Sequence, residues 1–161
     1  MTAAALVGSG EQFLLGTAKG KLFLFDVDKG KQVHDLEGHA HPILAGLHVS
    51  RDGRRAMTAC QGGKLIAWDL EGGKKLEESD ISNGTVKPWT IAFQADGRRA
   101  VVGYASVTVG LLQIDTKGKA KLAATHDKHG DRIVSVAMAA DGARALSAAE
   151  EALWCWELPK E

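Results

Sequence analysis

Residues 64–70 read Lys64-Leu65-Ile66-Ala67-Trp68-Asp69-Leu70, a short apolar run that closes on an acidic residue. Similar runs occur three more times, at residues 21–27, 111–115 and 153–158. The acidic residue recurs at intervals of 43, 46 and 42 residues, as Asp26, Asp69, Asp115 and Glu157. A fixed period of this length is typical of chains built from repeated supersecondary units.

A turn glycine follows the same period. It recurs at intervals of 43, 44 and 45 residues, as Gly10, Gly53, Gly97 and Gly142. An aspartate precedes the last three, and Asp-Gly between apolar alternations predicts a two-residue hairpin whose central positions both take positive φ. Each unit is therefore predicted to contain hairpins of short antiparallel strands.

The turns divide each unit into four expected strands, and the strand that ends on the acidic residue is nearly all apolar. Such a strand is expected to be covered on both faces. The expected strands are 2–7, 12–18, 21–26 and 32–37; 44–49, 55–60, 64–69 and 74–79; 88–93, 99–104, 109–114 and 120–125; and 133–138, 144–148 and 153–158. One domain, 1–161, would hold four units, at about 1–38, 39–80, 81–126 and 127–161.

Composition narrows the class of protein. The 161 residues are 45% apolar and 25% charged, which predicts one globular domain. Lys plus Arg and Asp plus Glu are both 20, so no basic excess points to nucleic acid or to a membrane surface. With no signal peptide in the chain as given, we expect a cytoplasmic protein without a cofactor. Cys60 and Cys155 lie in apolar runs and are predicted to be buried thiols.

Several residues carry a family resemblance. Gly38-His39 precedes a strand, Trp68-Asp69 ends one, and residues 137–142 form an AxxxDG turn. With the period and the four strands per unit, the chain resembles the WD-repeat β-propeller family. The DGRRA segments 52–56 and 96–100 look like bacterial members. The resemblance implies an all-β fold of about four propeller blades of four antiparallel strands each.

The resemblance also implies a hydrogen-bonded cluster of His, Ser or Thr, Asp and Trp in each blade. The matching residues are His39, Thr58 and Trp68 in the second unit and His129, Ser147 and Trp156 in the fourth. The Asp does not match, because its position falls at Gly62 and at Glu150. Phe25 and Ile114 stand where Trp is expected in the first and third units. Packing is therefore expected to hold those two blades.

Four blades are too few for the family's rings of seven or eight. An open arc would expose apolar end faces, which a monomer rarely tolerates. Met1 falls inside the first strand, so fifteen strands are expected, and the last blade lacks its outer strand. This leaves an unpaired interaction edge at Leu153, Trp154, Cys155 and Trp156. Two copies could close an eight-bladed ring as a homodimer. A complementary half-propeller from another polypeptide, or a lone four-bladed ring, are the alternatives.

Loop histidines are the candidates for a metal site. Zinc or nickel could bind His39, His41, His126 and His129. The structural interpretation is favoured, since no supporting Cys or carboxylate spacing completes a ligand set. Ser147 and Thr58 resemble nucleophiles in residue type alone, and no nucleophile elbow, P-loop or dinucleotide motif is present. The chain is therefore predicted not to be an enzyme.

Six arginines flank the turns, Arg51, Arg54, Arg55, Arg98, Arg99 and Arg144. We expect a solvated rim balanced by neighbouring aspartates. The sequence favours a protein-interaction scaffold for an unknown protein partner, with binding loops at 37–43, 80–88 and 126–132. The alternatives are a structural assembly unit, such as a split or engineered half-propeller, and a metal or small-ligand sensor.

Overall fold

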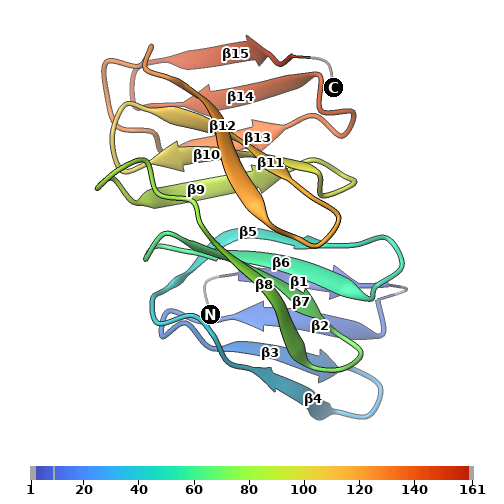
Figure 1. Ribbon diagram of the computed structural model, residues 1–161. Coiled ribbons are helices and arrows are strands. Elements are labelled where there is room, and N and C mark those ends of the chain that lie inside the picture. The colour runs from blue at the N-terminus through green and yellow to red at the C-terminus, as the bar shows by residue number, and fades with distance from the viewer. Residues whose placement is uncertain (1–2, 9, 160–161) are drawn as a thin grey trace.

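The computed structural model describes residues 3–8 and 10–159, and within these ranges the regular elements are all strands. Four antiparallel sheets follow one another in chain order (Figure 1). The strands are β1 (Ala3–Val7), β2 (Gln12–Gly16), β3 (Leu22–Asp26), β4 (Lys31–Leu36), β5 (Ile43–Val49), β6 (Arg55–Cys60), β7 (Lys64–Asp69), β8 (Lys74–Asp80), β9 (Pro88–Phe93), β10 (Arg99–Tyr104), β11 (Val109–Ile114), β12 (Ala120–His126), β13 (Ser135–Met138), β14 (Arg144–Ala148) and β15 (Leu153–Glu157). The all-β prediction is confirmed. Met1 lies outside the described residues.

Each sheet is a simple meander, in which every strand pairs with the next one along the chain. The first sheet is β1–β4, the second β5–β8, the third β9–β12 and the fourth β13–β15. The innermost strands β1, β5, β9 and β13 contact one another in turn. Between β5 and β9 the backbones approach so closely that a Cβ on Gly46 would overlap the carbonyl oxygen of Ile91. Glycine is therefore required at that crossing.

The Asp-Gly turns differ from the predicted two-residue type. In the second sheet Ser50 N donates to Arg55 O over 2.8 Å and Gly53 N donates to Ser50 O over 2.8 Å, so four residues form the loop. Gly53 has a φ of +69°, whereas no other residue type in the described ranges has positive φ. Asp52 has an ordinary negative φ, and its Oδ1 accepts the N–H of Arg54. Aspartate acts here as a side-chain acceptor.

The repeat alignment is wrong by two residues in the third sheet. The start of the second strand pairs with the end of the third in every sheet, as Arg55 with Asp69 and Arg144 with Glu157. Arg99 pairs with Gln113. Asp115 instead lies in the following turn, where its Oδ1 accepts the N–H groups of Lys117 and Lys119. As a result Leu112, and not Ile114, occupies the place of Trp68.

The core lies between successive sheets. Its apolar clusters join the first sheet to the second, the second to the third and the third to the fourth. Strands β7 and β11 are buried on both faces, as their composition predicts. Strand β15 is different, because all of its residues except Trp156 are exposed. Cys60 is buried, but Cys155 is exposed, so the prediction of two buried thiols is wrong for Cys155.

Candidate functional site

In the second sheet, one hydroxyl joins a histidine to a tryptophan. Trp68 Nε1 donates to Thr58 Oγ1 over 2.8 Å, and His39 Nε2 lies 2.7 Å from the same oxygen. Thr58 comes from β6 and Trp68 from β7, while His39 lies in the loop before β5. All three side chains are buried. The contact ties the entry loop of this sheet to its two central strands.

The fourth sheet repeats this arrangement. Trp156 Nε1 donates to Ser147 Oγ over 2.7 Å, and His129 Nε2 lies 2.6 Å from that oxygen. His39 Nδ1 and His129 Nδ1 are buried and have no hydrogen-bond partner in the described part of the chain. The resemblance predicts an aspartate in each cluster, and the sequence has Gly62 and Glu150 at those positions. Each cluster therefore has three polar members instead of four.

Burial controls the protonation of both histidines. It lowers the pKa of His39 from 6.5 to about 4, against the opposing effect of the Glu78 carboxylate. Burial also lowers the pKa of His129. A neutral imidazole can accept the hydroxyl proton of Thr58 or Ser147 while that hydroxyl accepts the indole N–H. The clusters are therefore suited to neutral pH and to a structural role.

The four candidate metal ligands are not brought together. His39 and His41 precede the second sheet, whereas His126 and His129 precede the fourth, and His126 stacks on Trp156 with ring centroids 4.9 Å apart. The described ranges contain no group of three His, Cys, Asp or Glu side chains that could hold a metal ion. The Thr58 and Ser147 hydroxyls are 0% exposed, so neither can meet a substrate from solvent.

The outer face of the first sheet is apolar and partly open to solvent. Strand pairing places Leu6, Phe13 and Phe25 in one row across β1, β2 and β3. Leu15 and Phe23 form the next row on the same face. Leu6 is 59% exposed and the other four are half-buried. These five side chains are called the bulky end face below.

The outer face of the fourth sheet is apolar too, but its side chains are smaller. Pairing places Ala137, Leu146 and Cys155 in one row across β13, β14 and β15, and Ala148 with Leu153 in the next. Leu153 is 69% exposed and Leu146 is 40% exposed. A hollow of about 380 Å³ is lined by Ala137, Leu146 and Cys155, with Arg144 at its side. These side chains form the hollow end face.

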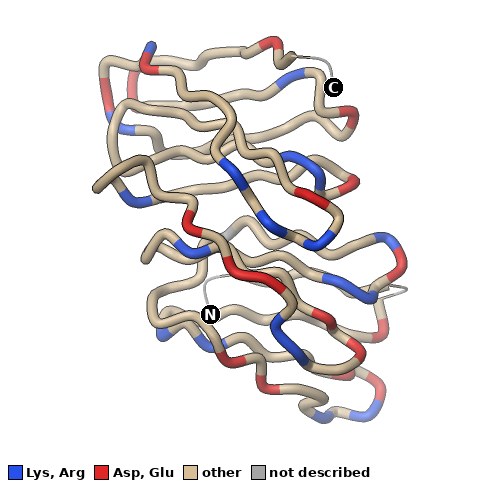
Figure 2. Tube along the Cα trace, viewed as in Figure 1, with Lys and Arg blue, Asp and Glu red and all other residues tan. Residues whose placement is uncertain are grey.

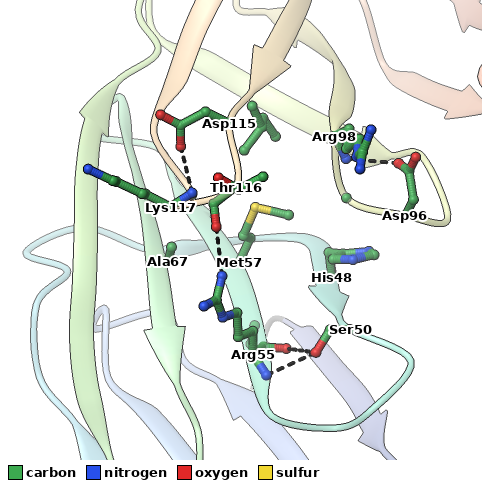
Figure 3. A pocket seen from close by; sticks show the side chains of 14 residues that line it. His48, Ser50, Arg55, Met57, Ala67, Asp96, Arg98, Asp115, Thr116 and Lys117 are labelled. Carbon is green, nitrogen blue, oxygen red and sulfur yellow. Dashed lines mark hydrogen bonds between the residues drawn. The ribbon is translucent and has the colours of Figure 1, made fainter.

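A cavity of about 260 Å³ opens at the rim between the second and third sheets (Figure 3). Met57, Ala67 and Ile114 give it apolar walls, and charged side chains surround its mouth. Arg55 crosses the crevice, and its Nη1 donates to Thr116 O over 2.7 Å. Because the cations at the mouth face Asp96 and Asp115, the cavity has no clear preference for a ligand of either charge.

The arginine rim is not uniformly solvated. Arg99 is only 6% exposed, and it donates from Nη1 to Pro159 O over 2.7 Å and from Nη2 to Gly142 O over 2.6 Å. The expectation of a solvated arginine is therefore wrong at this position. The two carbonyls belong to the fourth sheet, so Arg99 joins that sheet to the third. Elsewhere both basic and acidic residues occur at the turns (Figure 2).

One predicted binding loop, 126–132, contacts the start of β9 at the opposite rim. The Arg132 guanidinium lies 5.0 Å from the centroid of the Trp89 ring, which links loop 126–132 to the start of β9. Trp89 is 40% exposed, and Val134, two residues after Arg132, is 41% exposed. An accessible aromatic beside a cation is a common anchor in protein interfaces. Within the described residues, no helix has the length and apolarity to cross a membrane.

The stack of antiparallel meanders defines a class of fold, an arc of a β-propeller. A solved structure bears this out: the β-propeller domain of Cps50 (Swd1) from Myceliophteria thermophila matches with a TM-score of 0.81 at 15% sequence identity. The match covers 98% of this chain and 53% of that chain, so this chain spans about half the length of its neighbour. No family model and no curated protein matches the sequence.

Proposed function

We propose that the chain is a non-enzymatic protein-interaction scaffold, a half-propeller whose two end faces join those of a second copy in an eight-bladed ring. The observation that carries the proposal is the exposure of Leu153. Pairing places Leu153 at the position of Leu22 and Leu65 in the first two sheets, where the side chain is 0% exposed. It differs in having no following sheet to cover it in the described chain.

The two end faces match the two sides of an internal contact. Phe25 on the bulky end face corresponds by pairing to Trp68, Leu112 and Trp156, which each pack against the preceding sheet. Residues of the hollow end face correspond to those that pack against the following sheet. A bulky face against a hollow one would bury apolar surface at roughly 25 cal/mol per Å². Two head-to-tail contacts of this kind close a ring.

The loops near Trp89 and Arg132 give such a ring its proposed binding surface for a protein partner. Irregular loops on a rigid β-scaffold are where recognition commonly resides. The exposed indole and the guanidinium above it supply an apolar contact and a cation together. A partner segment with an apolar residue next to a carboxylate would fit this chemistry.

Sedimentation equilibrium at micromolar concentration tests the assembly. The wild-type chain is expected to show twice its 17.1 kDa mass. The Leu153→Asp variant should show one chain mass, since a charge would be buried unpaired in the contact. Leu76→Asp is the matched control, because Leu76 is 44% exposed on β8 and lies outside both end faces. A wild-type chain of single mass, or a Leu153→Asp variant of double mass, would overturn the proposal.

A further inference from the structure

Three arginines occupy one position of the repeat. Arg55, Arg99 and Arg144 each lie two residues after the turn glycine and open the second strand of their sheets. Each pairs with a residue at or next to the end of the outward neighbouring strand, Asp69, Gln113 or Glu157. Their backbones are therefore equivalent, and their side chains leave the sheet at the same rim.

Two of these arginines reach the following sheet. Arg55 Nη1 donates to Thr116 O, in the turn after β11, over 2.7 Å (Figure 3). Arg99 Nη1 donates over 2.7 Å to Pro159 O, just after β15. Both acceptors are backbone carbonyls that follow the third strand of the next sheet. We call this contact the arginine latch. Hydrogen bonds from a charged donor are about twice as strong as neutral ones.

The third arginine, Arg144, is exposed beside the hollow end face. No sheet follows it in the described chain. At the other end of the arc, the turn after β3 has no preceding sheet among the described residues. Lys29 in that turn binds Asp26, with Nζ and Oδ2 2.8 Å apart, while Asp28 is exposed. Among the described residues, a donor at one end and a turn at the other therefore both lack a neighbouring sheet.

We propose that Arg144 of one copy forms the arginine latch with the turn at Asp28 and Lys29 of a second copy. The inference rests on the proposed ring, and it names the polar contact that sets its register. Backbone carbonyls of the turn accept the guanidinium, as in the two internal latches, and the Asp28 carboxylate adds opposite charge. Apolar faces alone tolerate sliding, whereas a directional donor against one turn does not. A two-fold ring contains the latch twice.

The test measures the dimer dissociation constant by sedimentation equilibrium for the wild type and for Arg144→Glu. The variant is expected to weaken the dimer at least tenfold, because two latches are lost in each ring. Arg51→Glu is the matched control, since it makes the same charge change on an exposed turn residue outside the latch positions, and it should stay within twofold. Thermal unfolding at a concentration where both are monomeric checks that the variants fold alike.

A charge exchange sharpens the test. Asp28→Arg alone should weaken the dimer, and the double variant Asp28→Arg with Arg144→Glu should recover most of the lost affinity, since the new charges again face each other. If the wild type dimerises but Arg144→Glu changes nothing, the latch is wrong and the ring stands. If the wild type is monomeric, both the ring and the latch fail.

Discussion

The second and fourth sheets are held together differently from the first and third. In the second, Thr58 joins a buried histidine to a buried tryptophan. In the third, Val102 and Leu112 take the places of Thr58 and Trp68, and both are 0% exposed without a polar contact between them. The same meander is therefore stabilised by a polar cluster in one sheet and by packing in the next. The third sheet thus forms the same meander without the cluster, and the lowered pKa of His39 predicts that the second sheet is sensitive to pH.

Removing the tryptophan should have the largest effect. Trp68→Ala is expected to lower the free energy of unfolding by about 3–5 kcal/mol, because it leaves a cavity and removes the indole N–H that donates to Thr58 Oγ1. Leu112→Ala is the variant at the equivalent position of the third sheet, and its loss should be smaller because it removes less apolar volume and no hydrogen bond. Urea unfolding measures both. Equal losses would contradict this prediction.

Removing the central hydroxyl is expected to come next. Thr58→Val keeps the shape of the side chain but leaves the Trp68 indole N–H and the His39 ring nitrogen unpaired, at a cost of about 2–3 kcal/mol. Thr58→Ser retains the oxygen and should cost less than half as much. Urea unfolding at pH 7 separates the two variants. The cluster would lose its assigned role if serine and valine cost the same.

Acidification should destabilise the second and fourth sheets, and its effect should be somewhat smaller than that of removing the Thr58 hydroxyl. The pKa of His39 is about 4 in the folded chain and 6.5 when exposed, so the unfolded chain binds more protons between these values. The contribution of neutral His39 to the free energy of unfolding is present above pH 6.5 and is lost as the pH falls toward 4. The loss is roughly 2 kcal/mol between pH 7 and pH 5. Burial lowers the pKa of His129 and of His48 in the same direction.

Carboxylates contribute in a lower range. The pKa of Asp26 is lowered from 3.8 by its hydrogen bond to Lys29, so its effect appears below pH 4. His39→Gln should therefore flatten the dependence between pH 7 and pH 5 without changing it below pH 4. Urea unfolding at a series of pH values checks this. An unchanged slope in the variant would show that His39 does not titrate as assigned.

Completing the cluster should have the smallest effect, in the stabilising direction. A Cβ on Gly62 would overlap the His41 ring, so an aspartate there needs that ring removed. The double variant Gly62→Asp with His41→Ala tests whether a carboxylate in this turn reaches His39 Nδ1, and a gain of about 1 kcal/mol is expected. Gly62→Ala with His41→Ala is the control without the carboxylate. If the two unfold alike by urea, the buried nitrogen is not the weak point of the cluster.

Much of the fold could be predicted because the same apolar strands and turn residues recur in each unit. Apolar strands bounded by turn glycines identify all fifteen strands to within a few residues. The alignment failed at Asp115 because the acidic residue follows the strand instead of ending it, and pairing register depends on hairpin geometry that spacing alone does not reveal. Gln113, which takes the equivalent position in the third sheet, is not acidic and so does not mark the end of the strand in the sequence. The three-member clusters of His39 and His129 followed from matched residues in the sequence.

The arginine contacts and the exposure of Cys155 could not be predicted, because both depend on which sheet lies next. Arg55, Arg99 and Arg144 have the same local sequence position, yet one is buried, one spans a crevice and one is exposed. Cys155 lies in an apolar strand, but its face meets no sheet in the described chain. Local sequence determines the sheet, whereas its surroundings determine burial.

That dependence on a neighbouring sheet gives the most direct test of the account. The labelling rate of Cys155 by a thiol reagent reports whether the hollow end face is covered, and buried Cys60 is the control within the same chain. At micromolar concentration we expect both thiols to be protected, with Cys155 becoming reactive on dilution or in Arg144→Glu. Rapid labelling of Cys155 in the folded wild type at every concentration, with Cys60 protected, would contradict the ring.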